Sequence, residues 1–262
     1  MRHLLKPLVT RYRKRRNLRL GLRSRDPFVI SRELVGSGAN LIVDVGAHVG
    51  LAAKRYRELF PDATIHCFEP FPESFEQLER AAAGLAPIEL HAVALAAAAG
   101  EARFSVNRNS ATNSLLASDA HAEVYWRGDM PKTVGTLSVA TRTLDDFVAE
   151  HSIPRIDVLK LDAQGGEYDI LLGARDTLGR QAVALVYMEL ITAPTYVGQH
   201  RIREYLELFD DSGYELFDVY NLGRSQGRLL QTDIIVVSPK TLAQYEARLG
   251  LGSAGRWGQT PF

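Results

Sequence analysis

Two acids and two glycines near the start of the chain have the types and spacing of a nucleotide-type cofactor site. Asp44, Gly46 and Gly50 follow one apolar run, and Glu69 follows the next. Gly46 allows a tight turn after the first strand, while Gly50 lets the following helix start close against the sheet. Glu69 comes 19 residues after Gly50, near the spacing of about 20 residues at which a ribose-binding acid follows a glycine motif. The pattern therefore indicates a pocket for a cofactor that carries a ribose.

The glycine spacing argues against a dinucleotide. A dinucleotide-binding fold uses G-x-G-x-x-G to bring backbone amides against a pyrophosphate, whereas this chain has Gly46-x-x-x-Gly50. A cofactor with a ribose and a charged amino-acid part, but no phosphate, fits two acids and two glycines better than NAD does. S-adenosylmethionine is such a cofactor. The glycines alone could also mark an ordinary joint between a strand and a helix, a reading that Glu69 disfavours.

Hydrophobic periodicity predicts alternating strands and helices along most of the chain. We expect strands at residues 41–45, 64–68, 88–93, 102–106, 136–141, 156–162, 182–190, 214–220 and 232–237, with amphipathic helices between most of them. Such alternation is typical of a doubly wound, mostly parallel sheet, whose ligands bind at the carboxyl ends of the strands. The last two strands have the pattern of a hairpin, and no second domain is evident.

Acids at the ends of later strands are candidates for the chemistry. Asp162 is the first candidate for a general base, because a carboxylate beside the cofactor strand could accept the proton of a sugar hydroxyl; alternatively, it caps the following turn. Glu189, at the next strand end, could pair with Asp162 around substrate hydroxyls or a hard cation such as Mg²⁺. Two acids make a poor metal site, and we expect no metal. Glu167 lies in the first turn of a helix, where the helix dipole favours an acid without any function.

A polar stretch over residues 107–134 separates the two halves of the alternating pattern. So long an irregular segment is usually functional or mobile. Asn113 and Ser114 are expected to help close the site over cofactor or acceptor, and Tyr125 with Trp126 could stack on a sugar ring. The alternative is an ordinary polar loop with a buried aromatic anchor.

The composition indicates a globular protein with an uneven distribution of charge. Hydrophobic residues make up 46% and charged residues 24% of the chain, which is ordinary for a globular protein. The single cysteine excludes an internal disulfide and a CxxC metal site. No apolar run approaches the roughly 20 residues of a membrane span, and we expect a cytoplasmic protein.

The first 25 residues hold ten lysines and arginines and no acid, although the net charge of the chain is zero. Leu4, Leu5, Leu8, Val9 and Tyr12 give this basic arm the beginning of an apolar helical face. The arm could therefore lie on an anionic membrane surface, with nucleic acid less favoured because no aromatic stacking platform accompanies the arginines. Alternatively, it is a solvated arm or a helix packed on the acidic body of its own domain.

The chain resembles the FkbM-type S-adenosylmethionine-dependent methyltransferases over about residues 35–238. The resemblance is carried by VDVGAHVG at 43–50, CFEP at 67–70, TLDD at 143–146, LKLDAQGGE at 159–167 with LGA at 172–174, the strand of Glu189, YVGQ at 196–199 and QTD at 231–233. It implies the class I methyltransferase fold, a Rossmann-like, doubly wound α/β sheet of seven strands with an antiparallel last strand. We accordingly expect a basic arm or helix over residues 1–30, a methyltransferase domain over 31–249 and a flexible tail over 250–262.

The resemblance also implies roles for individual residues. Asp44, Gly46 and Gly50 are expected to line the methionine part of the cofactor, and Glu69 to hold the ribose hydroxyls. The full expected cofactor-binding set is Asp44, Gly46, Ala47, Gly50, Glu69, Pro70, Asn113, Ser114 and Asp162, and the expected catalytic pair is Asp162 and Glu189. The implied reaction is O-methylation of a small-molecule or glycan acceptor: a sugar, a polysaccharide component or a secondary metabolite.

Two residues depart from the family pattern, and two other functions stay open. His48 stands where the family usually has Asn, and Gln164 where Glu is frequent; Gln164 offers hydrogen bonds but no charge. His48 could reach the methyl site, although a histidine at a helix start is more often structural.

The other functions are an NAD-dependent, sugar-modifying oxidoreductase on a similar fold and a non-catalytic binding module docked by its basic arm.

Overall fold

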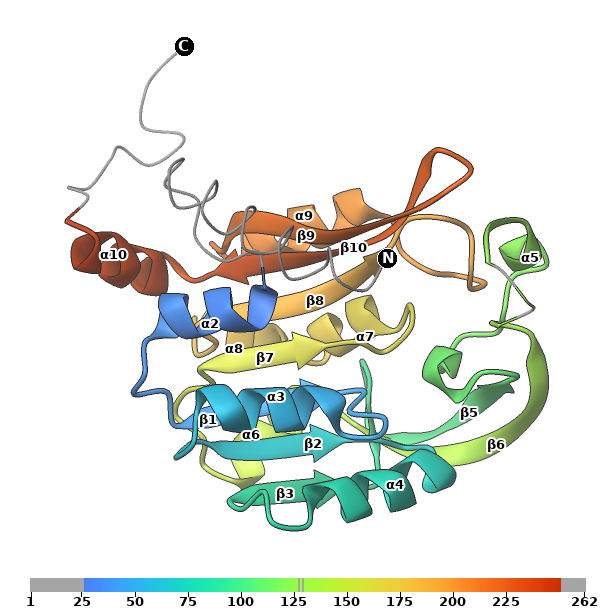
Figure 1. Cartoon of the computed structure of the whole chain (residues 1–262), viewed down its shortest axis with the longest axis horizontal. Helices are drawn as coiled ribbons and strands as arrows, with labels where there is room; N and C mark the ends of the chain where they lie inside the picture. Colours follow the sequence, from blue (N-terminus) through green and yellow to red (C-terminus); the bar gives the residue numbers. More distant parts are fainter. Residues whose placement is uncertain (1–25, 127, 129, 251–262) are drawn as a thin grey trace, which may run out of the picture.

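The computed structural model describes residues 26–250 except 127 and 129. Its centre is a seven-stranded sheet in the order β3-β2-β1-β7-β8-β10-β9 (Figure 1). The strands in chain order are β1 (Leu41–Val45), β2 (Thr64–Phe68), β3 (Ile88–His91), β7 (Val158–Leu161), β8 (Leu185–Ile191), β9 (Glu215–Ser225) and β10 (Arg228–Val237). Pairs among β3, β2, β1, β7 and β8 are parallel, whereas β10 is antiparallel to both β8 and β9. The predicted doubly wound sheet with an antiparallel last strand is confirmed.

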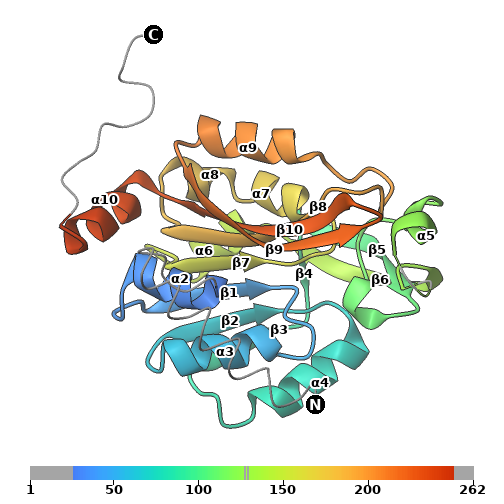
Figure 2. The same ribbon diagram turned by 45° about the horizontal axis from the view of Figure 1, so that its top comes forward.

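Helices cover both faces of this sheet (Figures 1 and 2). One face packs against α2 (Pro27–Val35), α3 (Leu51–Leu59), α4 (Pro72–Ala82) and α10 (Pro239–Arg248). The other face packs against α6 (Leu144–Glu150), α7 (Glu167–Leu172), α8 (Arg175–Gly179) and α9 (Ile202–Asp211). Because both faces are covered, the inner strands are buried without alternation: every residue of β7 is buried, the charged Lys160 included.

A second, three-stranded sheet extends from one end of the molecule. It consists of β4 (Ala94–Leu95), β5 (Gly100–Asn107) and β6 (Thr133–Arg142) in the order β4-β6-β5. The polar stretch between β5 and β6 contains a 3₁₀ turn (Ser110–Thr112) and the short helix α5 (Ala122–Tyr125). The prediction recognised two of these strands from their alternation, but it did not indicate that they would leave the main sheet and pair with each other.

Several element ends follow from local sequence signals. Strand β2 has the predicted bounds. Thr143 caps α6, because its Oγ1 accepts the N–H of Asp146 at 2.9 Å. The fourth core strand is shorter than predicted: β7 begins at Val158, while Ile156 makes only an isolated bridge.

The two chain ends bear on the domain boundaries. The predicted basic arm falls mostly on residues 1–25, and the predicted tail on 251–262, both outside the described residues. Helix α2 begins at Pro27 and buries Ile30 and Leu34, so the boundary expected at residue 30 falls inside a packed helix. None of the helices within residues 26–250 has the length and apolar character needed to cross a membrane.

Candidate functional site

The loop that follows β1 is fitted tightly between its neighbours. The N–H groups of Gly46 and Ala47 both donate to the carbonyl oxygen of Phe68, at 3.0 and 3.1 Å. Gly46 has φ +71°, and a Cβ on it would lie 1.9 Å from the backbone oxygen of Asp162. Only glycine can therefore occupy position 46 while the ends of β1, β2 and β7 stay this close.

The second predicted glycine acts differently from the expectation. Gly50 has φ +83°, and a Cβ there would meet Leu78 Cδ1 of α4 at 3.0 Å. The sequence predicted that Gly50 lets helix α3 start close against the sheet. The close neighbour is instead the adjacent helix, so Gly50 permits α3 and α4 to pack together.

Glu69 occupies the end of β2 as predicted from the strand pattern. Its two carboxylate oxygens accept the N–H groups of His48 and Phe71, each at 2.9 Å. Burial raises the pKa of Glu69 above its ordinary value, although these two hydrogen bonds act in the opposite direction. A carboxylate can accept about four hydrogen bonds, so Glu69 keeps acceptor capacity for a ligand.

A partly open pocket of about 260 Å³ lies at the carboxyl ends of β1, β2 and β7. Five residues of the predicted site line it: Gly46, Glu69, Pro70, Asn113 and Asp162. Its apolar walls include Phe68, Val93, Leu95, Phe104 and Leu115. No lysine or arginine of the described chain lines this pocket, so its charged rim is acidic.

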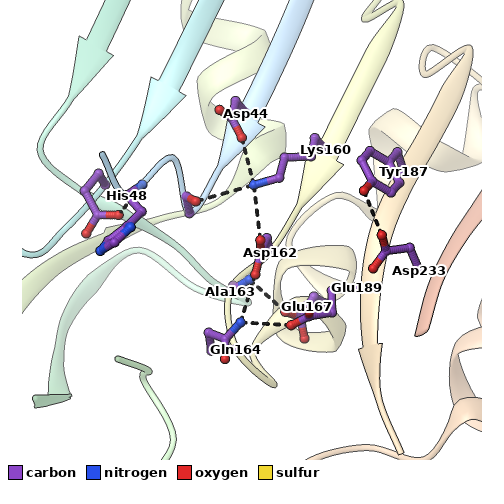
Figure 3. Close-up of polar contacts among 12 residues, drawn as sticks. Asp44, His48, Lys160, Asp162, Ala163, Gln164, Glu167, Tyr187, Glu189 and Asp233 are labelled. Carbon is purple, nitrogen blue, oxygen red and sulfur yellow. Dashed lines mark hydrogen bonds and ion pairs between the residues drawn. The ribbon is translucent and has the colours of Figure 1, made fainter. Parts of the chain in front are cut away.

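Asp44 lies beneath the pocket rather than in its wall. Its side chain is fully buried, and Oδ1 lies 3.1 Å from Lys160 Nζ (Figure 3). Lys160 Nζ also lies 3.5 Å from Asp162 Oδ2 and donates to the Gly46 carbonyl oxygen at 3.4 Å. Burial alone would lower the pKa of Lys160, but the charges of Asp44 and Asp162 outweigh it and the pKa is raised. Lys160 therefore stays charged and joins β1, its loop and Asp162.

Asp162 and Glu189 are brought together through Gln164 (Figure 3). Gln164 Nε2 donates to Asp162 Oδ1 and to Glu189 Oε2, both at 2.9 Å. The other oxygen of Glu189 accepts a hydrogen bond from Gln231 Nε2 at 2.8 Å. Burial, followed by the charge of Asp162, raises the pKa of Glu189 well above its ordinary value. Asp162 lines the pocket, whereas Glu189 is not among the lining residues.

Glu167 stabilises the loop between β7 and α7. Its Oε1 accepts the N–H of Ala163 at 2.7 Å, and its Oε2 accepts that of Gly165 at 3.0 Å. Burial raises its pKa to about 7 despite these bonds. Both oxygens bind the backbone of the loop that carries Asp162 and Gln164, which is a structural role.

Residues from the polar stretch cover the pocket. Asn113 Oδ1 accepts the N–H of Asn107 at 2.7 Å, while its Nδ2 is buried and has no hydrogen-bond partner. Ser114 does not line the pocket, and its Oγ donates to the Gln164 carbonyl oxygen at 2.8 Å. Tyr196 donates to Thr112 O at 2.8 Å and to Gln164 Oε1 at 3.1 Å. We call residues 110–116 the cover segment; it is anchored to the loop after β7.

A second, more open pocket adjoins the first. The two pockets share Gly46, His48 and Asp162, and the second also reaches Ala47, Phe28, Leu51, Arg55, Lys160 and Tyr187. His48 Nε2 lies 3.0 Å from Ser110 Oγ, and burial lowers the pKa of the imidazole. Asp162 is thus the carboxylate that faces both pockets.

The two aromatic residues proposed to stack on a sugar line neither pocket. Trp126 Nε1 donates to Thr195 Oγ1 at 2.8 Å, so it anchors the segment of α5. The guanidinium of Arg228 lies over the ring of Tyr125, 5.4 Å from its centroid. These contacts match the alternative of a polar loop with an aromatic anchor.

Comparison with known proteins decides the family. A model described as the methyltransferase FkbM domain matches residues 44–216, well over half of the chain. The chain belongs to the FkbM methyltransferase family. The matched region contains Glu69, the cover segment and both carboxylates joined by Gln164. Membership of this family identifies the protein as a methyltransferase and not as an oxidoreductase or a non-catalytic module.

Individual relatives agree with this assignment. The chain is 29% identical over 175 residues to 2-O-methyltransferase NoeI of Sinorhizobium fredii, covering 64% of this chain and 70% of NoeI. It is 24% identical over 155 residues to hexuronic acid methyltransferase AglP of Haloferax volcanii, covering 58% of this chain and 56% of AglP. Among solved structures, magnesium protoporphyrin IX methyltransferase (ChlM) from Synechocystis with bound SAM has 11% identity, a TM-score of 0.44, and coverage of 80% of this chain and 76% of its own.

Some residues of this FkbM site were not indicated by the sequence analysis. Lys160 is a lysine in the middle of a buried apolar strand, and that isolated charge was the signal that could have identified it. Val93, Leu95 and Phe104 form pocket walls, but apolar residues of short strands carry no mark that separates a pocket wall from core. Their role depends on how the small sheet docks.

Proposed function

We propose that this FkbM protein binds S-adenosylmethionine in the first pocket and transfers its methyl group to a sugar hydroxyl. The observation that carries the proposal is the combination of Glu69 and Asp162 in one pocket whose remaining walls are largely apolar. Apolar walls suit a flat purine, and a carboxylate at a strand end suits ribose hydroxyls. Both features lie at the carboxyl edge of the parallel strands, where ligands bind in this class of fold.

The donors and charges of the pocket fit this cofactor. Asn113 Nδ2 is a buried donor without a protein partner on a residue that lines the pocket, and a ligand acceptor would satisfy it. The acidic lining favours a ligand with positive sulfonium and ammonium groups. It disfavours a pyrophosphate, which would need cationic or backbone N–H partners.

The bound cofactor would supply a methyl group on a sulfonium, which is an already reactive donor. The chain's own task is then to position an acceptor hydroxyl and take its proton. We assign the proton to the Asp162 carboxylate, because Asp162 lines both pockets, Gln164 holds its Oδ1, and Lys160 Nζ lies 3.5 Å from its Oδ2. Glu189 supports this role through Gln164 and does not itself contact the pocket.

The acceptor class is inferred from chemistry and from relatives. A carboxylate that can accept a hydrogen bond from a hydroxyl suits a sugar. NoeI is described as a 2-O-methyltransferase and AglP as acting on hexuronic acid. We therefore propose a glycan or other small-molecule hydroxyl as acceptor. Peripheral membrane binding through residues 1–25 and a cytoplasmic location stay predictions.

Calorimetric titration tests the cofactor. The purified protein is titrated with S-adenosylmethionine and, separately, with NADH. We expect saturable binding of the first only, weakened at least tenfold by Glu69→Gln, because an amide group would meet the backbone N–H donors of His48 and Phe71 and lose ribose acceptors. The matched control Glu79→Gln, on the exposed side of α4, should leave binding unchanged. Binding of NADH alone would overturn the proposal.

A transfer assay tests the acceptor. Radiolabelled methyl transfer is measured to oligosaccharides that carry free hydroxyls, to the same compounds with their hydroxyls acetylated, and to hexuronic acids. Transfer that requires a free hydroxyl and survives base treatment identifies an ether product. Label that base releases would instead identify a methyl ester and contradict O-methylation at a hydroxyl.

A further inference from the structure

Two histidines and a glutamate meet on the opposite side of the sheet from helix α3. None of the three lines either pocket, although the His91 ring stacks on Phe68, a wall of the first pocket, with centroids 4.5 Å apart. His66 of β2 pairs in register with Glu89 of β3, and Phe68 with His91. Side chains of paired residues in parallel strands point to the same face, and residues two apart on one strand share a face. His66, Glu89 and His91 therefore project together toward Phe147 of α6, whose ring lies 5.1 and 5.3 Å from the two imidazole rings.

The ligand atoms of this cluster lie close together. His66 Nδ1 is 3.1 Å from His91 Nε2 and 3.5 Å from Glu89 Oε2. All three atoms lie within 4.8 Å of one another, and this is the one such group of His, Cys, Asp or Glu found within the described residues. Zinc binds imidazole nitrogen and carboxylate oxygen at about 2.0–2.2 Å, so two ligands of a tetrahedral ion are separated by about 3.3 Å. The separations of 3.1 Å between the two histidine nitrogens and 3.5 Å between His66 and Glu89 lie on either side of this expected distance.

We propose that His66, Glu89 and His91 form a binding site for Zn²⁺ or a similar divalent transition metal, separate from the methyl-transfer site. The three side chains supply three ligands, and a water completes a tetrahedral shell. The ion would tie the edge strand β3 to β2, because the ligands come from both strands.

The protonation of the histidines is compatible with metal binding. Burial is the main reason why the pKa of His91 is lowered to about 4, and burial also lowers the pKa of His66. Both imidazoles are therefore neutral at pH 7, the form that coordinates a metal. Without an ion, the two facing nitrogens share one hydrogen in an N–H···N bond. With an ion, that hydrogen moves to the other nitrogen of its own ring, so each imidazole stays neutral and both facing nitrogens donate lone pairs.

The surroundings provide a route for the ion and a balance of charge. Strand β3 is an edge of the main sheet, and the Glu89 side chain is 55% exposed, so solvent reaches the ligands. The nearest guanidinium, Arg142, is paired with Glu150 at 2.6 Å, which offsets its repulsion of a cation. His66 is 4% exposed, so this ligand is fixed in the core, whereas the Glu89 side chain is in contact with solvent.

The test is direct metal titration of the full chain, produced without an affinity tag and stripped with a chelator. Zn²⁺ binding is followed by calorimetry, and Co²⁺ binding by the visible absorption bands of the tetrahedral ion. We expect one ion per chain. His91→Gln and Glu89→Gln should each weaken binding at least tenfold, since even loss of an outer-shell partner typically costs 10- to 100-fold in affinity. His121→Gln, at an exposed histidine paired with Asp119, is the matched control and should bind as the original chain does.

Folding is monitored so that loss of binding is not confused with loss of structure. Circular dichroism of each metal-free variant should match that of the unaltered chain. Added Zn²⁺ should raise the thermal midpoint of the unaltered chain and of His121→Gln, but not of Glu89→Gln, because a ligand stabilises only the state that binds it. Absence of binding by the unaltered chain, or binding by His91→Gln and Glu89→Gln as tight as that of the unaltered chain, would overturn the proposal and leave the His66–His91 contact as a hydrogen bond.

Discussion

Gln164 holds Glu189 by a hydrogen bond of 2.9 Å from Nε2 to Oε2, and the same nitrogen holds Asp162 at the same distance. One neutral amide thus joins two strand-end carboxylates that would otherwise repel each other. A glutamate at position 164 would supply charge in place of these two donated hydrogens. In this protein, position 164 therefore orients the carboxylates and does not itself carry charge into the site.

Replacing Asp162 tests the proposed proton acceptor. Asp162→Asn keeps the side-chain shape but removes the group that takes the hydroxyl proton, so kcat should fall by about 10²- to 10⁴-fold. Asp162 also lines the cofactor pocket, so the calorimetric Kd for S-adenosylmethionine should rise as well, and kcat is therefore measured at saturating cofactor. Glu189→Gln should lose only about tenfold in kcat, because Glu189 does not line the pocket. Equal losses in both variants would contradict this division of roles.

The buried charges beneath the pocket should be strongly interdependent. Lys160→Met leaves the fully buried Asp44 without its cation, which should lower the free energy of unfolding by about 3–5 kcal/mol. The double variant Lys160→Met/Asp44→Asn removes both charges and should recover much of that loss. Urea unfolding of the two single variants and the double variant measures the coupling. If the single-variant losses simply add in the double variant, the ion pair is not what holds Asp44.

Position 46 should accept no side chain. Gly46→Ala places a methyl group 1.9 Å from a backbone oxygen of Asp162 and adds the strain of φ +71°, so we expect a loss of at least about 3 kcal/mol of stability. Gly84→Ala is the matched control, with φ +88° but no atom within 4 Å of the added carbon, and should cost only about 1–2 kcal/mol. Denaturant unfolding compares the two. Equal costs would mean that backbone strain, and not the contact with Asp162, selects glycine.

Glu167 should make stability fall as the pH rises. Its pKa is raised from 4.5 to about 7 in the folded protein, mainly by burial, so folding favours the protonated form. The stabilisation is complete below pH 4.5 and is lost as the pH rises through 7, on the order of 3 kcal/mol. Unfolding free energies of Glu167→Gln should therefore decline less between pH 5 and 8 than those of the original chain. The exposed control Glu79→Gln should keep the original slope; parallel curves for all three proteins would contradict the assignment to Glu167.

The sequence predicted those features of the fold and site that have local causes. Strand β2 is a short apolar run ended by a turn, and its bounds were predicted correctly. Glu69 could be placed at the end of that strand for the same reason. Helix α10 was not predicted, although its signals are present: Ser238 caps the helix and Pro239 begins it.

What could not be predicted depends on contacts between distant segments. Lys160 becomes a central charge because β7 lies beside β1, which brings its nitrogen to Asp44. Val93 and Phe104 become pocket walls because the small sheet docks at the edge of the large one. The bond between Ser114 and Gln164 spans 50 residues. Neither hydrophobic periodicity nor a local motif indicates contacts between residues so far apart in the sequence. Strand β4 has only two residues, which is too short for an alternating pattern to be recognised.

The attachment of the cover segment has a consequence for how such a protein can change over evolutionary time. This segment lies outside the main sheet. Ser114 bonds both Ser105 of β5 and the loop at Gln164, and the Tyr196 hydroxyl joins Thr112 of the segment to Gln164. Insertions or exchanges within it leave the register of the seven strands untouched. Changes in this segment can therefore alter the lining of the first pocket, which includes Asn113, while the sheet that supports the pocket is inherited unaltered.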